Sequence, residues 1–298
     1  METVGTILAT AAGLLLIGVA GRDIFDALFH PEGRGALARR IARGVWGAFR
    51  RAGVSRRALA GAGPLTLLVV IATWAALLAL GWALVYLPHI PEGFSGVSGG
   101  ASDWVDAVNI SLVTLTTVGF GDVVPSADWL RIVTPLEALL GFGLLSASIS
   151  WLLLIYPVLA RRRLLAYEIR LLRDAAAEEP GVLEHLRGEP AERLYQELTS
   201  RLIAVERDLV NFPITYYFAE ADERFSLPAV APYLLELAEH GTADPSGHVR
   251  LRARLLRRAV ADFAATTASG FHGMAGATTE ELLHAYARDH LGPGAVRP

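Results

Sequence analysis

Long apolar runs alternate with arginine-rich segments in the first 160 residues. Residues 3–20 carry no charge over 18 positions, and residues 65–87 carry none over 23. A third run, residues 129–159, is interrupted by Arg131 and Glu137. A helix crosses a bilayer with about 17–25 apolar residues, so the pattern predicts three spanning helices, at 1–29, 65–87 and 129–160. A cleaved signal peptide needs a positive n-region, which Met1 and Glu2 do not provide, so an uncleaved first helix is favoured.

The arginines predict the topology. Many lie between the first two apolar runs, and three more, Arg161 to Arg163, follow the third, whereas residues 88–103 contain none. Positive charge stays on the cytoplasmic side of a membrane. We therefore expect a multi-pass cell-membrane protein with its N-terminus outside and its C-terminal part in the cytoplasm.

Residues 30–64 predict an amphipathic linker helix. Leu37, Ile41, Val45 and Phe49 recur at every fourth position, with most arginines elsewhere around the helix. We expect the segment Arg34–Arg57, together with Arg161 to Arg163, to contact anionic lipids of the inner leaflet. A solvated linker is the alternative. A voltage sensor would carry arginine at every third position within a spanning helix, and this segment does not.

Residues 161–298 have a different hydropathy pattern, in which charged amphipathic stretches are separated by proline and glycine. This pattern predicts an all-helical cytoplasmic domain of ordinary size. Few runs are rich in β-branched residues, and no Gly-x-Gly-x-x-Gly motif follows a predicted strand, so a nucleotide-binding domain is not expected.

Composition narrows the function classes further. Hydrophobic residues make up 53% of the chain and mean hydropathy is +0.39, values typical of a protein partly dissolved in lipid. The chain has no cysteine, which excludes disulfides and thiolate metal sites. No catalytic motif occurs, so we expect neither an enzyme nor an organic cofactor, and no nucleic-acid partner.

The stretch TLTTVGFGDVVP, from Thr114 to Pro125, lies between the second and third apolar runs. Irregular backbone at membrane depth requires protein or water around it. Gly119 and Gly121 can adopt left-handed dihedrals and alternate with their neighbours, so that all carbonyls point one way. Four such strands around an axis would form oxygen rings that replace the hydration shell of K⁺. The alternative is a glycine-rich turn in a soluble loop.

Thr-Val-Gly-Phe-Gly resembles the selectivity filter of the potassium channel family, in its two-transmembrane pore-loop form with an extra N-terminal helix. The resemblance covers residues 65–160, as outer helix 65–87, pore helix 104–116, filter 117–121 and inner helix 129–160. It implies a pore-loop tetrameric cation channel fold, all-α, in which a homotetramer binds K⁺ along the filter at Thr117, Val118, Gly119, Phe120 and Gly121.

By the same resemblance, Thr116 and Asp122 support the filter and its outer mouth. Family channels often pair the residue at Asp122 with an acid on the pore helix, but the matching position here is Val113. Glu137 lies on the inner helix, where it either braces the filter from behind or makes a structural hydrogen bond to a neighbouring helix.

The inner helix also carries the expected gate. Gly141 resembles the hinge glycine of the family, although a small residue that lets helices pack closely is an equal alternative. Helical spacing from Gly141 places Leu145, Ile149 and Leu153 on one face, where they would line the cavity and a hydrophobic gate.

Three functions stay open at this level. A potassium-selective channel is favoured by the intact filter motif. A non-selective cation channel and a membrane-anchored sensor or interaction protein with a non-conducting pore are the alternatives. We expect residues 212–218 to form core or a subunit contact. Residues 219–223 could contribute to a divalent-cation site but lack the spaced oxygen ligands of a calcium loop, and residues 250–258 favour a solvated helix face over a site for lipid headgroups or an acidic ligand.

Overall fold

A computed structural model describes residues 2–28, 35–97, 103–179, 181–274 and 276–291. Arg34, where the predicted lipid-binding segment begins, lies outside these residues, as does part of the predicted outer loop. The described chain forms two compact units: residues 1–44 with 65–153, and residues 45–64 with 154–298.

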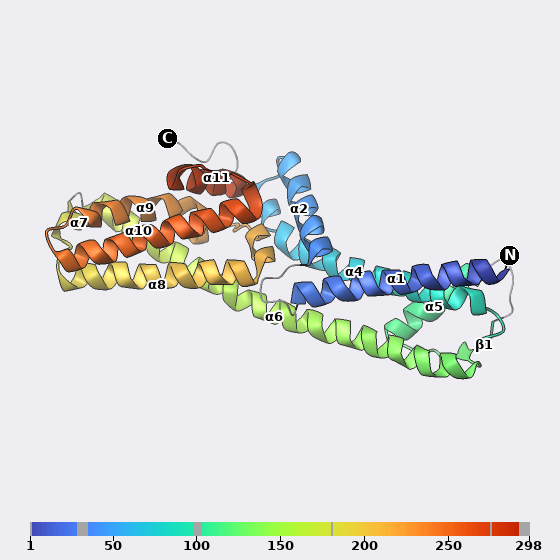
Figure 1. Cartoon of the computed structure of the whole chain (residues 1–298). Helices are drawn as coiled ribbons and strands as arrows, with labels where there is room; N and C mark the ends of the chain where they lie inside the picture. Colours follow the sequence, from blue (N-terminus) through green and yellow to red (C-terminus); the bar gives the residue numbers. More distant parts are fainter. Residues whose placement is uncertain (1, 29–34, 98–102, 180, 275, 292–298) are drawn as a thin grey trace. The chain divides into compact units, whose positions relative to one another are not determined.

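The first unit is built from apolar helices and a short pore-loop segment. In chain order it contains α1 (Glu2–Leu28), the start of α2 (Ala36–Arg51), most of α4 (Ala62–Tyr86), η1 (Leu87–His89), β1 (Phe94–Ser95), α5 (Asp103–Leu115), β2 (Val124–Pro125) and the first half of α6 (Asp128–Glu178) (Figure 1).

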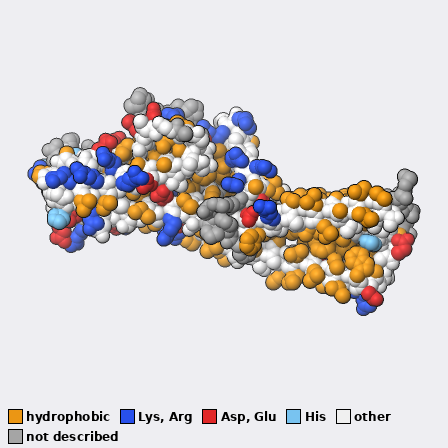
Figure 2. Space-filling model, viewed as in Figure 1, with side chains coloured by type: hydrophobic (Ala, Val, Ile, Leu, Met, Phe, Trp, Pro, Cys, Tyr) orange, Lys and Arg blue, Asp and Glu red, His pale blue; other side chains and the backbone are white. Residues whose placement is uncertain are grey.

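Three helices in the described part of the chain are long and apolar enough to cross a membrane, within the ranges 3–28, 56–89 and 128–178. Their positions agree with the three apolar runs of the sequence. Figure 2 shows that hydrophobic side chains cover most of the visible face of this first unit, whereas charged side chains are spread over the second. The protein is therefore an all-α membrane protein.

Helix α1 packs closely on α4 inside the first unit. A Cβ atom at Gly13 would collide with the carbonyl oxygen of Gly81, and one at Gly81 would press on Ile17 and the Gly13 oxygen. Small residues at a crossing point let two helix backbones approach within a membrane. The extra N-terminal helix is thus part of the same packed unit as α4.

Every regular element in the described residues of the second unit is a helix. It contains the end of α2, α3 (Arg56–Leu59), the second half of α6, α7 (Val182–His185), α8 (Glu189–Asn211), η2 (Pro213–Tyr217), η3 (Glu223–Phe225), α9 (Leu227–Thr242), α10 (Gly247–Thr267), η4 (Ala268–His272) and α11 (Thr279–Leu291). Figure 1 shows α8, α9 and α10 lying side by side. Leu202, Leu234, Leu237, Leu256 and Phe263 are among the fully buried core side chains.

The length of one helix and the buried face of another differ from the sequence expectation. Helix α6 runs to Glu178, well beyond the expected end at residue 160. It continues because Leu165 and Ile169 keep a buried apolar face inside the second unit. In α2 the buried positions are Ala38, Ala42 and Trp46, one residue beyond the predicted stripe, and Leu37, Ile41, Val45 and Phe49 are half-buried.

Candidate functional site

Helix α5 ends in a motif that sets the conformation of the first filter residue. The amide of Thr117 donates to the Thr114 carbonyl at 2.9 Å, and the amide of Val118 donates to the Val113 carbonyl at 3.0 Å. These two bonds form a Schellman motif, whose C′ residue is left-handed. Thr117 accordingly has a φ of 58°, which no other described non-glycine residue matches with a positive value. A β-branched residue there is strained, which marks the position as one held by its surroundings.

The backbone that follows alternates in handedness. Gly119 has a φ of 55° and Gly121 a φ of 80°, while Val118 and Phe120 between them do not have positive values. Alternating left- and right-handed residues turn successive peptide planes the same way, so that their carbonyls point to one side. A Cβ atom at either glycine would meet nothing within 4 Å, so in a single chain the dihedrals, rather than lack of space, require glycine.

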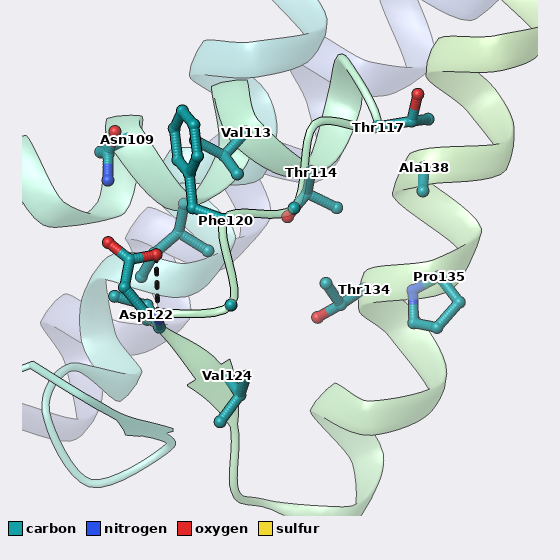
Figure 3. Close-up of a pocket in the computed structure, with 14 residues that line it drawn as sticks. Asn109, Val113, Thr114, Thr117, Phe120, Asp122, Val124, Thr134, Pro135 and Ala138 are labelled. Carbon is teal, nitrogen blue, oxygen red and sulfur yellow. Dashed lines mark hydrogen bonds between the residues drawn. The ribbon is translucent and has the colours of Figure 1, made fainter.

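The filter side chains have little cover within one chain. The side chain of Phe120 is 72% exposed, and Val118 is exposed as well. Behind the segment lies a hollow of about 490 Å³, lined by α5, the filter and α6. Figure 3 shows Thr117 and Phe120 on the filter and Asp122 just after it, with Thr134, Pro135 and Ala138 across from them on α6.

A short sheet holds the outer end of the segment. Strands β1 and β2 pair antiparallel, with Phe94 opposite Pro125 and Ser95 opposite Val124. Gly96 follows β1 with a φ of 94°, and a Cβ atom there would collide with the Asp122 carbonyl oxygen. Asp122 itself accepts a hydrogen bond from the Val123 amide at 3.0 Å. Its carboxylate thus serves the local turn, in keeping with the apolar Val113 on the pore helix.

Glu137 ties three helices together behind the filter. Its carboxyl oxygens accept hydrogen bonds from the Tyr86 hydroxyl of α4 at 2.6 Å and from the Ser111 hydroxyl of α5 at 2.5 Å. The Glu137 side chain is completely buried. The arrangement fixes α5 against both long helices. It agrees with the hydrogen bond to neighbouring helices that the sequence offered as one role, and the role of a brace behind the filter stays a prediction.

Thr116, also expected to support the filter, uses its hydroxyl to donate to the Leu112 carbonyl of its own helix at 2.6 Å. The same carbonyl accepts the Thr116 amide at 3.0 Å, so Thr116 makes two hydrogen bonds to the last turn of α5.

At Gly141, the backbone of α6 passes close to the end of α5. A Cβ atom on Gly141 would collide with the carbonyl oxygen of Leu115, whereas one on Gly143 would meet nothing within 4 Å. The glycine at residue 141 therefore serves close packing in this structure, and its use as a hinge stays a prediction. Leu145, Ile149 and Leu153 are all exposed in the single chain, whereas Leu144, just before them, is buried.

The sequence reading missed Asp23. This buried residue of α1 accepts hydrogen bonds from the Leu37 and Ala38 amides, at 2.8 and 3.1 Å, and from the Trp74 indole nitrogen at 2.9 Å. It therefore caps the start of α2 from a different helix and connects α1, α2 and α4. An acid close to the end of an apolar helix was the available signal, since a buried carboxylate needs donors.

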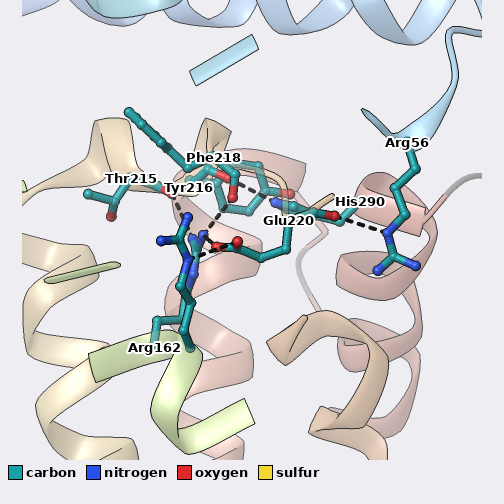
Figure 4. Close-up of polar contacts among 8 residues, drawn as sticks. Arg56, Arg162, Thr215, Tyr216, Phe218, Glu220 and His290 are labelled. Atoms are coloured by element: carbon teal, nitrogen blue, oxygen red, sulfur yellow. Dashed lines mark hydrogen bonds and ion pairs between the residues drawn. The ribbon is translucent and has the colours of Figure 1, made fainter. Parts of the chain in front are cut away.

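A second missed cluster lies in the second unit, after the apolar part of α6. Arg162 donates to the Thr215 carbonyl at 2.8 Å and the Phe218 carbonyl at 2.6 Å, and pairs with Glu220 at 3.0 Å (Figure 4). Arg163 pairs with the same Glu220 at 2.9 Å, and Arg56 donates to the Glu220 carbonyl at 3.0 Å. The segment that follows η2 thus connects α6 to α3.

Aromatic residues surround this cluster. Tyr216 donates to Asp289 at 2.6 Å and stacks on Phe271, with ring centroids 3.8 Å apart. His290 is buried, and its Nε2 lies 2.8 Å from the Tyr216 carbonyl oxygen. Burial lowers the pKa of His290 to about 4. The predicted core role of residues 212–218 agrees with the burial of Ile214, Tyr216 and Tyr217.

Comparison with known proteins bears on the pore segment. Residues 68–154 match the model of a protein family described as "Ion channel". The chain is also 29% identical, over 132 residues, to the "Uncharacterized membrane protein YdjJ" of Bacillus subtilis (strain 168). That alignment covers 44% of this chain and 39% of the relative, so the chain spans about two fifths of the relative's length. No solved structure matches. The match, the pore loop and the three apolar helices agree in showing that residues 68–154 are similar to an ion-channel domain.

Proposed function

We propose that this membrane protein with an ion-channel domain is a homotetrameric, potassium-selective channel of the cell membrane, and not an enzyme. Its N-terminus would lie outside, and its helical C-terminal part would lie in the cytoplasm. The activity is passive conduction of K⁺ down its gradient.

The observation that carries the proposal is the alternation of φ along Thr117, Gly119 and Gly121, directly after a pore helix. In a filter, carbonyl oxygens replace the water molecules around the ion. The carbonyls of Thr117, Val118, Gly119 and Phe120, with the Thr117 hydroxyl, are the proposed K⁺ ligands. No organic cofactor takes part in this chemistry.

A single chain supplies one strand of such a filter, and a ring of oxygens needs four. The exposure of Val118 and Phe120, and of Leu145, Ile149 and Leu153 on α6, supports assembly around an axis. In the tetramer, Leu145, Ile149 and Leu153 would line the cavity and close it as a hydrophobic constriction that excludes water. Gly141 would be the point at which α6 moves.

Anionic lipids are the proposed partners of α2. Arg39, Arg40 and Arg43 are exposed on this helix, as surface attachment requires. The arginines after the apolar part of α6 are instead paired with carboxylates, Arg161 with Asp208 at 2.7 Å and Arg163 with Glu220 at 2.9 Å. We therefore restrict the main lipid contact to α2.

Gating would come from movement of α6, from the filter, or from both. The cytoplasmic helices bias that equilibrium to the extent that they bind a ligand differently in the open and closed states.

The test combines assembly with transport. Light scattering on the purified protein in detergent should give a tetramer, and liposomes loaded with K⁺ should lose it when a counter-ion pathway is provided. Gly119→Asp should abolish the K⁺ flux and leave the tetramer, because the aspartate cannot adopt the required dihedral without strain and adds charge to the ion path. A tetramer equally permeable to Na⁺ would favour a non-selective channel. Stable oligomers without flux under every condition tried would favour a membrane-anchored interaction protein.

A further inference from the structure

The part of α6 that belongs to the second unit exposes an apolar stripe, which we define as Tyr156, Ala160, Leu164, Tyr167, Leu171 and Ala175. Leu164 is 53% exposed and Leu171 is 51% exposed, although the helix buries Leu165 and Ile169 on its other side. Tyr167 is half-buried and contacts Phe225, with ring centroids 5.5 Å apart.

Contact with lipid does not explain why the stripe is apolar after Arg163. Helix α6 has 51 residues, which at ~1.5 Å per residue span about 76 Å, against about 30 Å of hydrocarbon. Arg161 to Arg163 mark the cytoplasmic end of the apolar run. Leu164 and Leu171 come after these arginines, so they face water in an isolated chain.

The apolar repeat of the stripe continues that of the proposed pore lining. Leu145, Ile149 and Leu153 are separated by four residues each, and from Leu153 the steps are three, four, four, three, four and four to Ala175. A repeat of three, four and four residues has a period of about 3.67 per turn, which keeps one face of a nearly straight helix toward a common axis. Every position of this repeat is apolar.

The charges beside the stripe are neutralised inside each chain. Arg163 pairs with Glu220 at 2.9 Å, and Asp174 pairs with Arg170 at 3.1 Å. On the other flank, Glu168 pairs with Arg201. Between residues 163 and 174, copies of the helix brought together along the stripe would therefore not meet unpaired like charges, which would oppose a parallel arrangement. The exposed Glu178, at the next position of the repeat, ends the apolar stripe.

We propose that the stripe is a self-association surface, on which the α6 helices of four copies of this chain pack around the pore axis below the membrane. The inference rests on the proposed tetramer. It adds that the stripe, which lies outside residues 68–154, packs against the same stripe of the other copies. Such a bundle connects the second units of neighbouring subunits directly to the helix that carries the gate. It would make the movement of α6 concerted among the four copies.

Cysteine cross-linking tests the proposal, because the chain has no cysteine of its own. In the full-length protein in liposomes, Leu164→Cys and Leu171→Cys should each give covalent dimers with a short bismaleimide. Two matched controls should not: Leu251→Cys on α10, whose leucine is 57% exposed, and Arg173→Cys on the opposite side of α6. Equal cross-linking of the controls would overturn the inference.

A second measurement separates this proposal from the proposed function. Leu164→Glu combined with Leu171→Glu should lower the temperature at which the tetramer dissociates in detergent, because four copies of each carboxylate would meet at the axis. Leu251→Glu with Leu255→Glu, at leucines 57% and 45% exposed, is the matched control. A K⁺-conducting tetramer without cross-links at Leu164 and Leu171 would refute the bundle and leave the channel intact. A monomeric protein would refute the tetramer on which both proposals rest.

Discussion

Individual residues make contacts that a single substitution can remove. Glu137 accepts two hydrogen bonds from two other helices, and Gly141 allows a backbone approach that no larger residue permits. His290, in the second unit, stays neutral through burial. Each of these residues gives a prediction with a matched control.

Gly141→Ala should destabilise the protein by about 1–3 kcal/mol, because its methyl group would collide with the Leu115 carbonyl. Gly143→Ala should be neutral or stabilise the helix by up to about 1 kcal/mol, because the added atom meets open space. Thermal unfolding in detergent measures both. Equal behaviour of the two variants would contradict the packing role of Gly141.

Glu137→Ala should cost about 1–3 kcal/mol for each of the two hydroxyls that lose their acceptor. The K⁺ over Na⁺ permeability ratio should fall with it, because α5 then loses its link to α4 and α6. Glu137→Gln keeps an acceptor oxygen, so its stability and its permeability ratio should lie between those of Glu137→Ala and the wild type. A fully stable and selective Glu137→Ala protein would show that the carboxyl group is not a brace.

Acid should destabilise the second unit through His290. Its pKa is lowered from 6.5 to about 4 by burial, so the unfolded chain binds a proton at a higher pH than the folded chain does. The stability that depends on neutral His290 is therefore complete above pH 6.5 and is lost as the pH falls toward 4, by on the order of 3 kcal/mol. Between these pH values, the free energy of unfolding of His290→Gln should depend less on pH than that of the wild type. His248→Gln, at an exposed histidine, should keep the wild-type pH dependence.

Among the elements, the joint at Asp23 links three helices that the sequence presents as separate. Helix α2 begins where the Asp23 carboxylate accepts two of its free amides, and a helix N-terminus is stabilised by such an acceptor. The same carboxylate holds the Trp74 indole of α4. The start of the amphipathic helix is thus held by a residue of α1.

Asp23→Ala should lower stability by about 0.5–2 kcal/mol for the lost cap, with a further about 1–3 kcal/mol for the unpaired indole. Amide exchange at Leu37 and Ala38 should become faster. Asp26→Ala removes an exposed ion pair with Arg22 and should cost less than about 1 kcal/mol. Unchanged exchange in Asp23→Ala would show that the cap does not hold α2.

At the scale of the whole molecule, the sequence predicts the spanning helices and the pore loop well because both depend on local signals. Apolar run length sets the first, and the spacing of Gly119 and Gly121 indicates the second. The conformation of Thr117 was not predictable, since it follows from the hydrogen bonds that end α5. The partners of Glu137 were equally hidden, because Ser111 and Tyr86 lie 26 and 51 residues away in the chain.

The end of α6 cannot be predicted from the sequence for a related reason. Three consecutive arginines at Arg161 to Arg163 suggested the end of a membrane helix, and they do end its apolar part. Yet each of them has a carboxylate partner in the second unit, so the helix continues through them. Charge patterns indicate where lipid ends and do not show where a helix ends.

The most direct test of potassium selectivity is the reversal potential of the reconstituted protein, with K⁺ on one side of the membrane and Na⁺ on the other. A reversal close to the potassium equilibrium potential, absent in Gly119→Asp, is the predicted result. A reversal near zero in the wild-type protein would contradict the selective filter, and with it the assignment of Thr117 to Phe120 as potassium ligands.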